Sequence, residues 1–356
     1  MMNKIMSLTK QLIAIESTDK KKDKLQEAID VCAKELDGYT IETFNQNAHP
    51  SILVYSAKQR PKQFDVIFNG HLDVVSALPH QFVPEERGGK LYGRGACDMK
   101  AAAVVELLVF KEVAKMLSRP VALQLVTDEE IGGYDGTYAQ IKSGVRSPFV
   151  IAGESTDLCV GQKSKGVIWM NVKAKGTAAH GAYQWRGESA ILKMKRAIDL
   201  IEKEFPILTK DVWRTTINIA KIETTNTTYN KVPDDCLMKL DIRYTPEDWK
   251  TIKNKLEKMF HGLEMEFLEF EPPQVTNETN PYYQQLLKSI ESVASKKADV
   301  IAKHGSSDVR HFSRVEGEGV VFGPVGSGLH SDGEWVDIKS LETYHAILAM
   351  FLRSLG

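Results

Sequence analysis

The chain has 356 residues, of which 42% are hydrophobic and 26% are charged, so its composition is that of a folded globular protein and not a disordered one. Its 46 basic and 47 acidic side chains give a formal net charge of -1, which excludes a general electrostatic attraction to nucleic acid or an anionic membrane. Because this length exceeds one typical hydrophobic core, we expect two packed domains or one large domain with an insertion.

The beginning of the chain lacks the long apolar stretch and the cleavage site of a signal peptide. The most apolar later run, residues 101–110, is short and interrupted by Glu106, so we expect a cytoplasmic protein with no membrane partner. The four cysteines form no CxxC pair, which argues against a disulfide framework and against a thiolate zinc site. Cys97 could be a nucleophile, but no base lies beside it in the sequence, and a buried thiol is the simpler interpretation.

The first part of the chain alternates helical and strand patterns. Helical spacing is expected over residues 4–15, 23–36, 100–117 and 135–143, and apolar strand-like runs lie at 41–44, 51–55, 64–70, 121–126 and 149–152. This alternation predicts an α/β fold with a mainly parallel sheet and helices on both faces. Three of the runs lead directly into acidic or imidazole side chains, so we expect the chemistry at the carboxyl edge of that sheet.

From about Lys165 the pattern changes to long alternating strands. These strands are expected at 166–176, 215–223, 236–244 and 263–270, with helices at 188–204 and 246–260. We therefore predict an α+β domain at residues 165–272, with one sheet face available for association. This domain is inserted into a catalytic domain made of residues 1–164 and 273–356, where helices near 281–295 and 339–354 and a strand near 320–323 resume the first pattern.

Candidate chemistry begins at GHLDVV, residues 70–75. His71 and Asp73 are two residues apart and can lie on one side of an extended chain. A carboxylate there can hydrogen-bond one imidazole nitrogen and leave the other free for a metal. Taken alone, the pair is more simply a strand-end histidine capped by a nearby carboxylate.

Two acidic segments follow. Asp98 in YGRGACDMKAA precedes an expected helix, so by itself it is most simply an N-cap residue. TDEE at 127–130 places three carboxylates after a strand, which is costly unless a cation or solvent relieves the charge. Neighbouring side chains diverge, so of Glu129 and Glu130 one can bind a metal while the other takes a proton from the attacking water. A solvated acidic turn is the alternative.

Two further candidates lie later in the chain. Glu154 ends an apolar strand and His330 lies in a glycine-rich loop, and each taken singly is more simply a capping or solvent-facing residue. Two histidines and three carboxylates together, with one carboxylate bridging, suit two zinc ions roughly 3.5–4 Å apart. The sequence therefore predicts a two-zinc centre built from His71, Asp98, Glu130, Glu154 and His330.

The ordered motifs GHLDVV, GRGACDMKAA, TDEEIGG, AGEST, AAHGAY and GPVGSGLH resemble those of the co-catalytic zinc deacylases and exopeptidases. That family includes succinyl-diaminopimelate desuccinylase, acetylornithine deacetylase, aminoacylase-1 and carboxypeptidase G, and the resemblance covers essentially the whole chain. It implies that one zinc is held by His71 and Glu154. It implies that the other is held by Glu130 and His330, with Asp98 shared by both.

The resemblance also implies roles outside the ligand set. Glu129 is expected to be the general base and Asp73 to orient His71. The inserted domain is expected to form a homodimer interface, with His180 reaching into the partner's site to stabilise the oxyanion. Without the resemblance, His180 is a surface histidine in a Gly/Ala turn.

Three positions match substrate-carboxylate contacts of the family: Asn230, Arg243 and Arg310. Arginine suits this role because its guanidinium can hold a carboxylate through two parallel hydrogen bonds. Without the resemblance, both arginines would be surface ion pairs. The chain departs from the family pattern at ESTDKKKDK, which lacks a Ser-Gly-x-Glu turn, and at Gln184, where proline is common. These departures concern the subfamily and touch no proposed ligand.

We therefore expect a dizinc amidohydrolase that removes a succinyl or acetyl group from an N-acyl amino acid such as N-succinyl-diaminopimelate or N-acetylornithine. Cobalt is expected to be able to replace zinc. A dipeptidase or aminopeptidase with the same centre is the alternative within hydrolases. A non-catalytic metal- or amino-acid-binding relative is the alternative from another class, and the Glu129–Glu130 pair argues against it because a binder has no use for a spare base.

Overall fold

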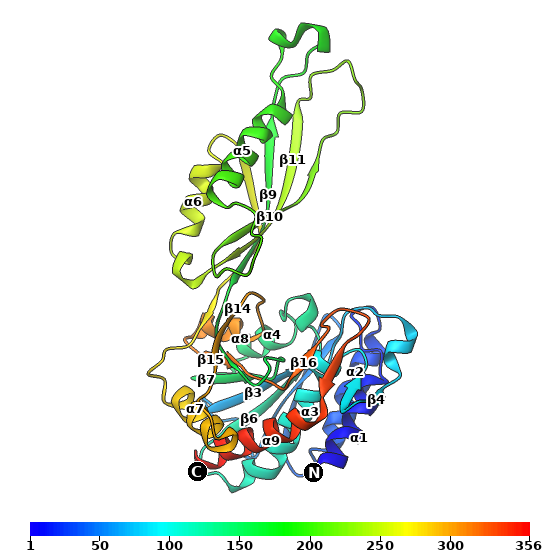
Figure 1. The fold of residues 1–356 in the computed structure, drawn as a ribbon, viewed down its shortest axis with the longest axis vertical. Helices are drawn as coiled ribbons and strands as arrows, with labels where there is room; N and C mark the ends of the chain where they lie inside the picture. Colours follow the sequence, from blue (N-terminus) through cyan, green and yellow to red (C-terminus); the bar gives the residue numbers. More distant parts are fainter. The chain divides into compact units, whose positions relative to one another are not determined.

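The computed structural model describes residues 1–356, which divide into two compact units (Figure 1). Unit 1 comprises Met1–Lys163, Gln274–Ala302 and Ser307–Gly356. Unit 2 comprises Ser164–Pro273 together with the short segment Lys303–Ser306. Each unit has buried apolar clusters of its own. None of the helices has the length and apolar character needed to cross a membrane.

Unit 1 is built on a nine-stranded sheet. The strand order is β1 (Thr40–Gln46), β2 (His49–Tyr55), β6 (Val121–Val126), β3 (Val66–His71), β7 (Phe149–Ala152), β15 (Glu318–Val321), β8 (Val160–Ser164) and β13 (Gln274–Val275), with β14 (Val300–Lys303) paired to β8. The four central strands, β6, β3, β7 and β15, are parallel. Strands β1, β2 and β8 pair antiparallel, so the sheet is mixed and its parallel part is confined to the centre.

Helices cover both faces of this sheet. They are α1 (Met2–Ile13), α2 (Lys22–Lys34), α3 (Ala101–Val113), α4 (Thr137–Lys142), α7 (Pro281–Ala294), α8 (Val309–Phe312) and α9 (Ile338–Arg353). Successive residues of β3 enter different cores, because Val66 and Phe68 pack with α1, α3 and α9 while Ile67 packs with residues of α4 and α8. The apolar runs of the sequence are therefore strands buried on both sides.

A second, small sheet of unit 1 was not predicted. It has the order β16 (Gly326–Ser327), β17 (Trp335–Asp337), β5 (Lys90–Tyr92) and β4 (Glu85–Arg87). Strands of two or three residues are too short to show a period in the sequence. The sheet matters because it joins the segment before Asp98 to the loop that carries His330.

Unit 2 is a four-stranded antiparallel sheet with two main helices. Its strands have the order β10 (Thr216–Glu223), β11 (Asp235–Tyr244), β9 (Gly166–Lys175) and β12 (Glu264–Glu271), and its helices are α5 (Ala190–Glu204) and α6 (Ile252–Met259). Alternate residues of β9, such as Met170 and Val172, are buried with Met194 and Leu256 of the helices. An α/β unit with helices on both faces and an α+β unit confirm the predicted fold class.

Candidate active site

The parallel centre of the unit 1 sheet brings three predicted site residues to one edge. Strands β6, β3 and β7 are neighbours, and their carboxyl ends point the same way. His71 is the last residue of β3, Glu130 follows the end of β6, and Glu154 follows the end of β7. The arrangement agrees with the general rule that sites of open α/β sheets lie beyond the carboxyl ends of strands.

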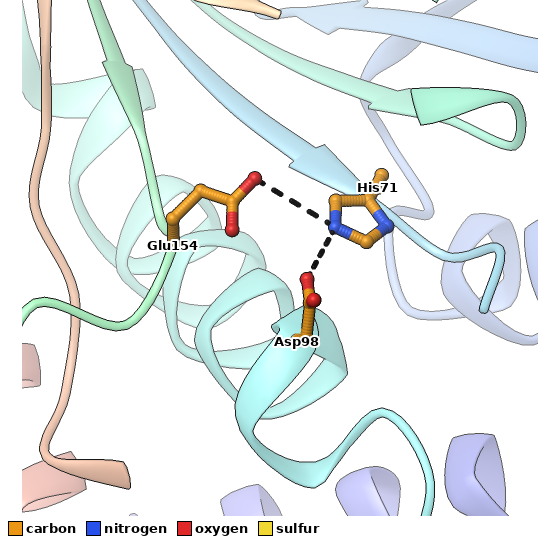
Figure 2. A group of neighbouring side chains, drawn as sticks. All are labelled: His71, Asp98 and Glu154. Atoms are coloured by element: carbon orange, nitrogen blue, oxygen red, sulfur yellow. Dashed lines mark hydrogen bonds and ion pairs between the residues drawn. The ribbon is translucent and has the colours of Figure 1, made fainter. Parts of the chain in front are cut away.

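The first group of candidate ligands is His71, Asp98 and Glu154 (Figure 2). Nε2 of His71 lies 3.0 Å from Oδ1 of Asp98 and 3.8 Å from Oε1 of Glu154. All three side chains are buried, and Figure 2 shows both carboxylates directed at the same imidazole nitrogen. One nitrogen and two carboxylate oxygens therefore converge on a single point.

The second group is Asp98, Glu130 and His330. Nε2 of His330 lies 3.2 Å from Oδ2 of Asp98 and 3.0 Å from Oε2 of Glu130. Asp98 thus directs one carboxylate oxygen to each histidine, as a ligand shared by two ions would. The side chain of His330 is half exposed, so this group is open to solvent on one side.

The segment around Asp98 does not cap a helix. Asp98 has extended backbone angles, with φ -124° and ψ 91°, and α3 begins after Lys100 without a side-chain cap. The N-cap interpretation of Asp98 is therefore wrong, and its carboxylate is directed to the two histidines instead. Cys97, beside it, is buried, and burial raises the pKa of its thiol to about 12, so it is not an activated nucleophile.

The donor set fits divalent metal ions. In each group the candidate ligand atoms lie within 4.8 Å of one another. Burial, together with the nearby charge of Asp98, raises the pKa of Glu130 to about 7. Hydrogen bonds from His330 and His71 lower the pKa of Asp98 in spite of its burial. Packed carboxylates of this kind are costly without a cation, and imidazole with carboxylate is a ligand combination suited to zinc.

Asp73 connects the two groups. Nδ1 of His71 donates to the backbone carbonyl of Asp73 at 3.0 Å, whereas the nearer carboxylate oxygen of Asp73 lies 3.5 Å away. The carboxylate also accepts the backbone N–H groups of Glu129, at 3.3 Å, and of Glu130, at 3.0 Å. Asp73 therefore contacts His71 through its carbonyl and its carboxylate, and the same carboxylate holds the acidic turn, a second contact that the sequence did not indicate.

Glu129 lies in the same turn, Glu129–Ile131, directly after Asp128. Burial and the negative charge of Glu154 raise the pKa of Glu129 well above its usual range. Its side chain is half-buried and belongs to neither candidate ligand group. The structure thus places the carboxyl group of Glu129 near the two groups of candidate metal ligands without making it a member of either group.

Arg310, in α8 of unit 1, is buried and contacts the loop that follows this turn. Its Nη2 donates to the carbonyl of Gly132 at 2.7 Å, and its Nη1 lies 3.9 Å from Asp308. The guanidinium of Arg310 therefore holds the loop that follows the acidic turn through the carbonyl of Gly132.

The remaining predicted residues belong to unit 2. His180 is exposed, and its Nδ1 accepts a hydrogen bond from the backbone of Ala182 at 3.1 Å. The carbonyl of Asn230 accepts the N–H of Gly181 at 2.7 Å, so His180 and Asn230 are neighbours. Arg243 lies on β11, where its Nε donates to Asp241 at 2.9 Å.

His180 and Arg243 lie toward opposite ends of unit 2. The segment with His180 follows β9 and runs beside residues 230–234, next to the Asp235 end of β11. Arg243 is near the other end of β11, opposite Val167. The run from Asp235 to Arg243 spans roughly 26 Å at ~3.3 Å per residue. One small ligand cannot contact both side chains of the same chain.

Residues 67–354 match the family model described as Peptidase family M20/M25/M40. The chain belongs to this family. A succinyl-diaminopimelate desuccinylase of Bordetella petrii is 29% identical over 318 residues, which cover 82% of each chain. The predicted family resemblance is confirmed, and the chain is a metal-dependent hydrolase of amide bonds.

Solved structures of M20 peptidases share the fold. An aminopeptidase from Bacillus cereus aligns with a TM-score of 0.79 and 16% identity over 100% of this chain and 99% of that chain. A metallo-carboxypeptidase of the M20 family from Sulfolobus solfataricus aligns with a TM-score of 0.76 and 17% identity over 98% of each chain. At these identities the likeness establishes the architecture alone.

Two charged residues next to the site were missed in the sequence. Arg94 and Glu334 form a buried ion pair that contacts the backbone on both sides of the second ligand group. An ion pair between residues so far apart in the chain leaves no local pattern in the sequence. The one indication was that Arg94 lies in the segment GRGACD and Glu334 in the segment HSDGEW, next to proposed ligands.

Proposed function

We propose that this M20 family member is a dizinc amidohydrolase. In this proposal His71 and Glu154 hold one zinc, Glu130 and His330 hold the other, and Asp98 bridges them. The observation that carries it is the approach of the two carboxylate oxygens of Asp98 to two different histidines, at 3.0 and 3.2 Å. When bound, the zinc ions supply a Lewis acid that polarises the substrate carbonyl and lowers the pKa of water.

Glu129 acts as the general base in this proposal. Its carboxylate takes a proton from the attacking water and returns it to the leaving amine, so that the products are a free amine and a carboxylate. A carboxylate whose pKa is raised, here by burial and by the charge of Glu154, is a stronger base toward the proton of the attacking water than an ordinary glutamate. Asp73 holds the backbone of Glu129 and thereby fixes where this proton is exchanged.

The proposed substrate is an N-acyl amino acid with an acidic acyl group, such as a succinyl group. A cavity of about 300 Å³ in unit 2 supports this choice, since its polar lining is mostly basic: Lys165, Lys210, Arg243 and His304, with Asp211 as the one acidic residue. Arg243 would bind the acyl carboxylate there through its guanidinium. Arg310 is proposed as a further substrate contact of the same chain, and Asn230, which neighbours His180, as a contact supplied by the partner chain. The curated relative from Bordetella petrii bears the name of a desuccinylase.

We further propose that residues 165–272 form a dimerisation domain and that residues 1–164 and 273–356 form the catalytic domain. His180 would then stabilise the oxyanion in the partner's site. The separation of His180 from Arg243 within unit 2 supports this, because the two roles require both groups at one substrate. In a dimer, Arg243 of one chain and His180 of the other chain would contact the same substrate, which the two residues of a single chain cannot do.

The test is a panel of N-succinyl and N-acetyl amino acids and dipeptides, assayed with added zinc or cobalt. We expect the N-succinyl substrates to give the highest kcat/KM, and Arg243→Ala to raise KM for them more than for the N-acetyl substrates. Fastest cleavage of dipeptides would instead support an exopeptidase with the same centre. Absence of hydrolysis across the panel would contradict the proposed deacylase.

A further inference from the structure

A buried ion pair lies beside the second ligand group. Nη1 of Arg94 and Oε2 of Glu334 are 2.5 Å apart, and the two side chains are 3% and 0% exposed. Removing two charges from water is costly unless further hydrogen bonds offset the loss. A buried ion pair is therefore not by itself evidence that the pair stabilises the fold. The remaining contacts of the two side chains show which parts of the molecule the pair connects.

Glu334 contacts the segment of the bridging ligand. Its Oε1 accepts the backbone N–H of Cys97 at 2.9 Å and of Asp98 at 3.1 Å. The turn before this segment requires glycine at position 95. Its φ is +85°, and a Cβ there would come within 2.9 Å of the side chains of Lys100 and Val74. The main chain of Asp98 is therefore held by a carboxylate from the other end of the sequence.

Arg94 contacts the loop of His330. Its Nη2 donates to the carbonyl of Ser331, the residue after His330, at 3.2 Å, and Nε2 of Gln81 donates to the same carbonyl at 3.1 Å. His330 itself has φ 58°, a left-handed conformation that a histidine keeps only where surrounding contacts enforce it. The loop is also closed on itself, since a Cβ at Gly328 would lie 2.8 Å from the carbonyl of Gly333.

We infer that the Arg94–Glu334 pair is a positioning device that fixes Asp98 and His330 relative to each other and so sets the metal affinity of the Asp98–Glu130–His330 position. This inference rests on the proposed two-zinc centre. The effect is asymmetric. The ligands that only the other position uses, His71 and Glu154, follow strands of the large sheet, outside the two segments that the pair contacts.

The experiment is a zinc titration of the whole protein in competition with a chromogenic chelator, after metal removal with EDTA. The variants are Arg94→Met, which removes the guanidinium, and Glu334→Gln, which keeps an acceptor of the same size but loses the charge. Arg94→Lys is the conservative variant. Arg119→Gln is the matched control, because it breaks an exposed ion pair with Asp65 on unit 1.

We expect the wild type and Arg119→Gln to bind two zinc ions with the same pair of affinities. In Arg94→Met and Glu334→Gln the affinity of the Asp98–Glu130–His330 position should fall about 10–100-fold, the range seen for groups that orient metal ligands. The other position, which shares only Asp98 with it, should lose affinity by a clearly smaller factor. Arg94→Lys should recover part of the loss. Circular dichroism of the metal-free proteins reports folding separately, and Glu334→Gln carries the test if Arg94→Met does not fold.

Equal loss at both positions, or unchanged affinities in folded Glu334→Gln, would overturn the positioning role. Fewer than two zinc ions bound by the wild type would instead contradict the proposed centre itself, so the two failures can be told apart.

Discussion

The carboxylate of Asp73 accepts the backbone N–H of Glu130 at 3.0 Å, while the carbonyl of the same residue accepts Nδ1–H of His71 at 3.0 Å. A donor hydrogen on Nδ1 leaves Nε2 of His71 as the free nitrogen, and Nε2 is the atom that faces Asp98 and Glu154. One residue therefore orients a proposed ligand of each metal position. It also holds the N–H of Glu129, the proposed base.

Asp73→Asn tests this arrangement. The amide can accept only one of the two N–H groups and presents a donor to the other, so the Glu129–Glu130 turn should shift while the carbonyl contact to His71 remains. We expect kcat to fall about 10–100-fold, with both zinc ions still bound when zinc is in excess. Steady-state kinetics and metal analysis measure the two effects. Asp65→Asn, on the surface, is the control, and an unchanged kcat in Asp73→Asn would show that the turn needs no such support.

Glu129→Gln separates metal binding from proton transfer. The substituted amide would have nearly the same shape as the carboxylate but could not take a proton from water, and Glu129 belongs to neither ligand group. We expect two zinc ions per chain, as in the wild type, and a kcat reduced by about 100-fold or more. Metal analysis and steady-state kinetics on the same preparation are the measurements. A variant with an undiminished rate would end the assignment of Glu129 as the base.

Zinc binding should depend on pH through His330. Its hydrogen bond with Asp98 raises the pKa of His330 to about 8, so the imidazole of the metal-free protein is protonated at neutral pH. A ligand must be neutral, so zinc displaces this proton, and affinity at the Asp98–Glu130–His330 position should rise with pH until about 8. Glu130, whose pKa burial raises to about 7, acts in the same direction.

The folding stability of the metal-free protein should depend on pH with the opposite sign, so that it falls as the pH rises. A raised pKa in the folded state contributes stability that is present below the unfolded pKa of 6.5 and is lost as the pH rises through about 8. Chelator-competition titrations from pH about 6 to about 9 measure the first effect, and thermal unfolding in EDTA measures the second. A zinc affinity that is constant across this range would contradict the involvement of His330.

Mixing two inactive variants tests whether His180 acts in the site of its own chain or in that of the partner. His180→Ala chains keep the base and Glu129→Gln chains keep the histidine, so a mixed dimer has one complete site only if His180 crosses to the partner. Random exchange makes about half of the dimers mixed, so about a quarter of the wild-type activity should return. The assay is turnover after unfolding and refolding the mixture, with each variant alone as control. No recovery would place His180 in its own chain's site.

The parts of the site on long elements could be predicted from the sequence. His71, Glu130 and Glu154 follow apolar runs that form adjacent parallel strands, and such strands end at a common edge. Asp98 was harder, because a single acidic residue before a helix resembles an N-cap, and only its partners show otherwise.

Contacts between distant short segments could not be predicted in this way. Strand β5 pairs with β17 over three residues, which is too few for any period to appear. The ion pair of Arg94 with Glu334 joins residues 240 positions apart, and its partners include backbone groups that carry no sequence signal. The family resemblance could supply the candidate ligands and Asp73, but not the buried pair of Arg94 and Glu334 beside them.

The most direct test of the proposed centre is anomalous X-ray diffraction at the zinc absorption edge, from crystals of the wild-type protein grown with zinc. We expect two anomalous peaks per chain, roughly 3.5–4 Å apart, one between His71 and Glu154 and the other between Glu130 and His330, with Asp98 contacting both. A single peak, or two peaks that do not share Asp98, would contradict the two-metal centre.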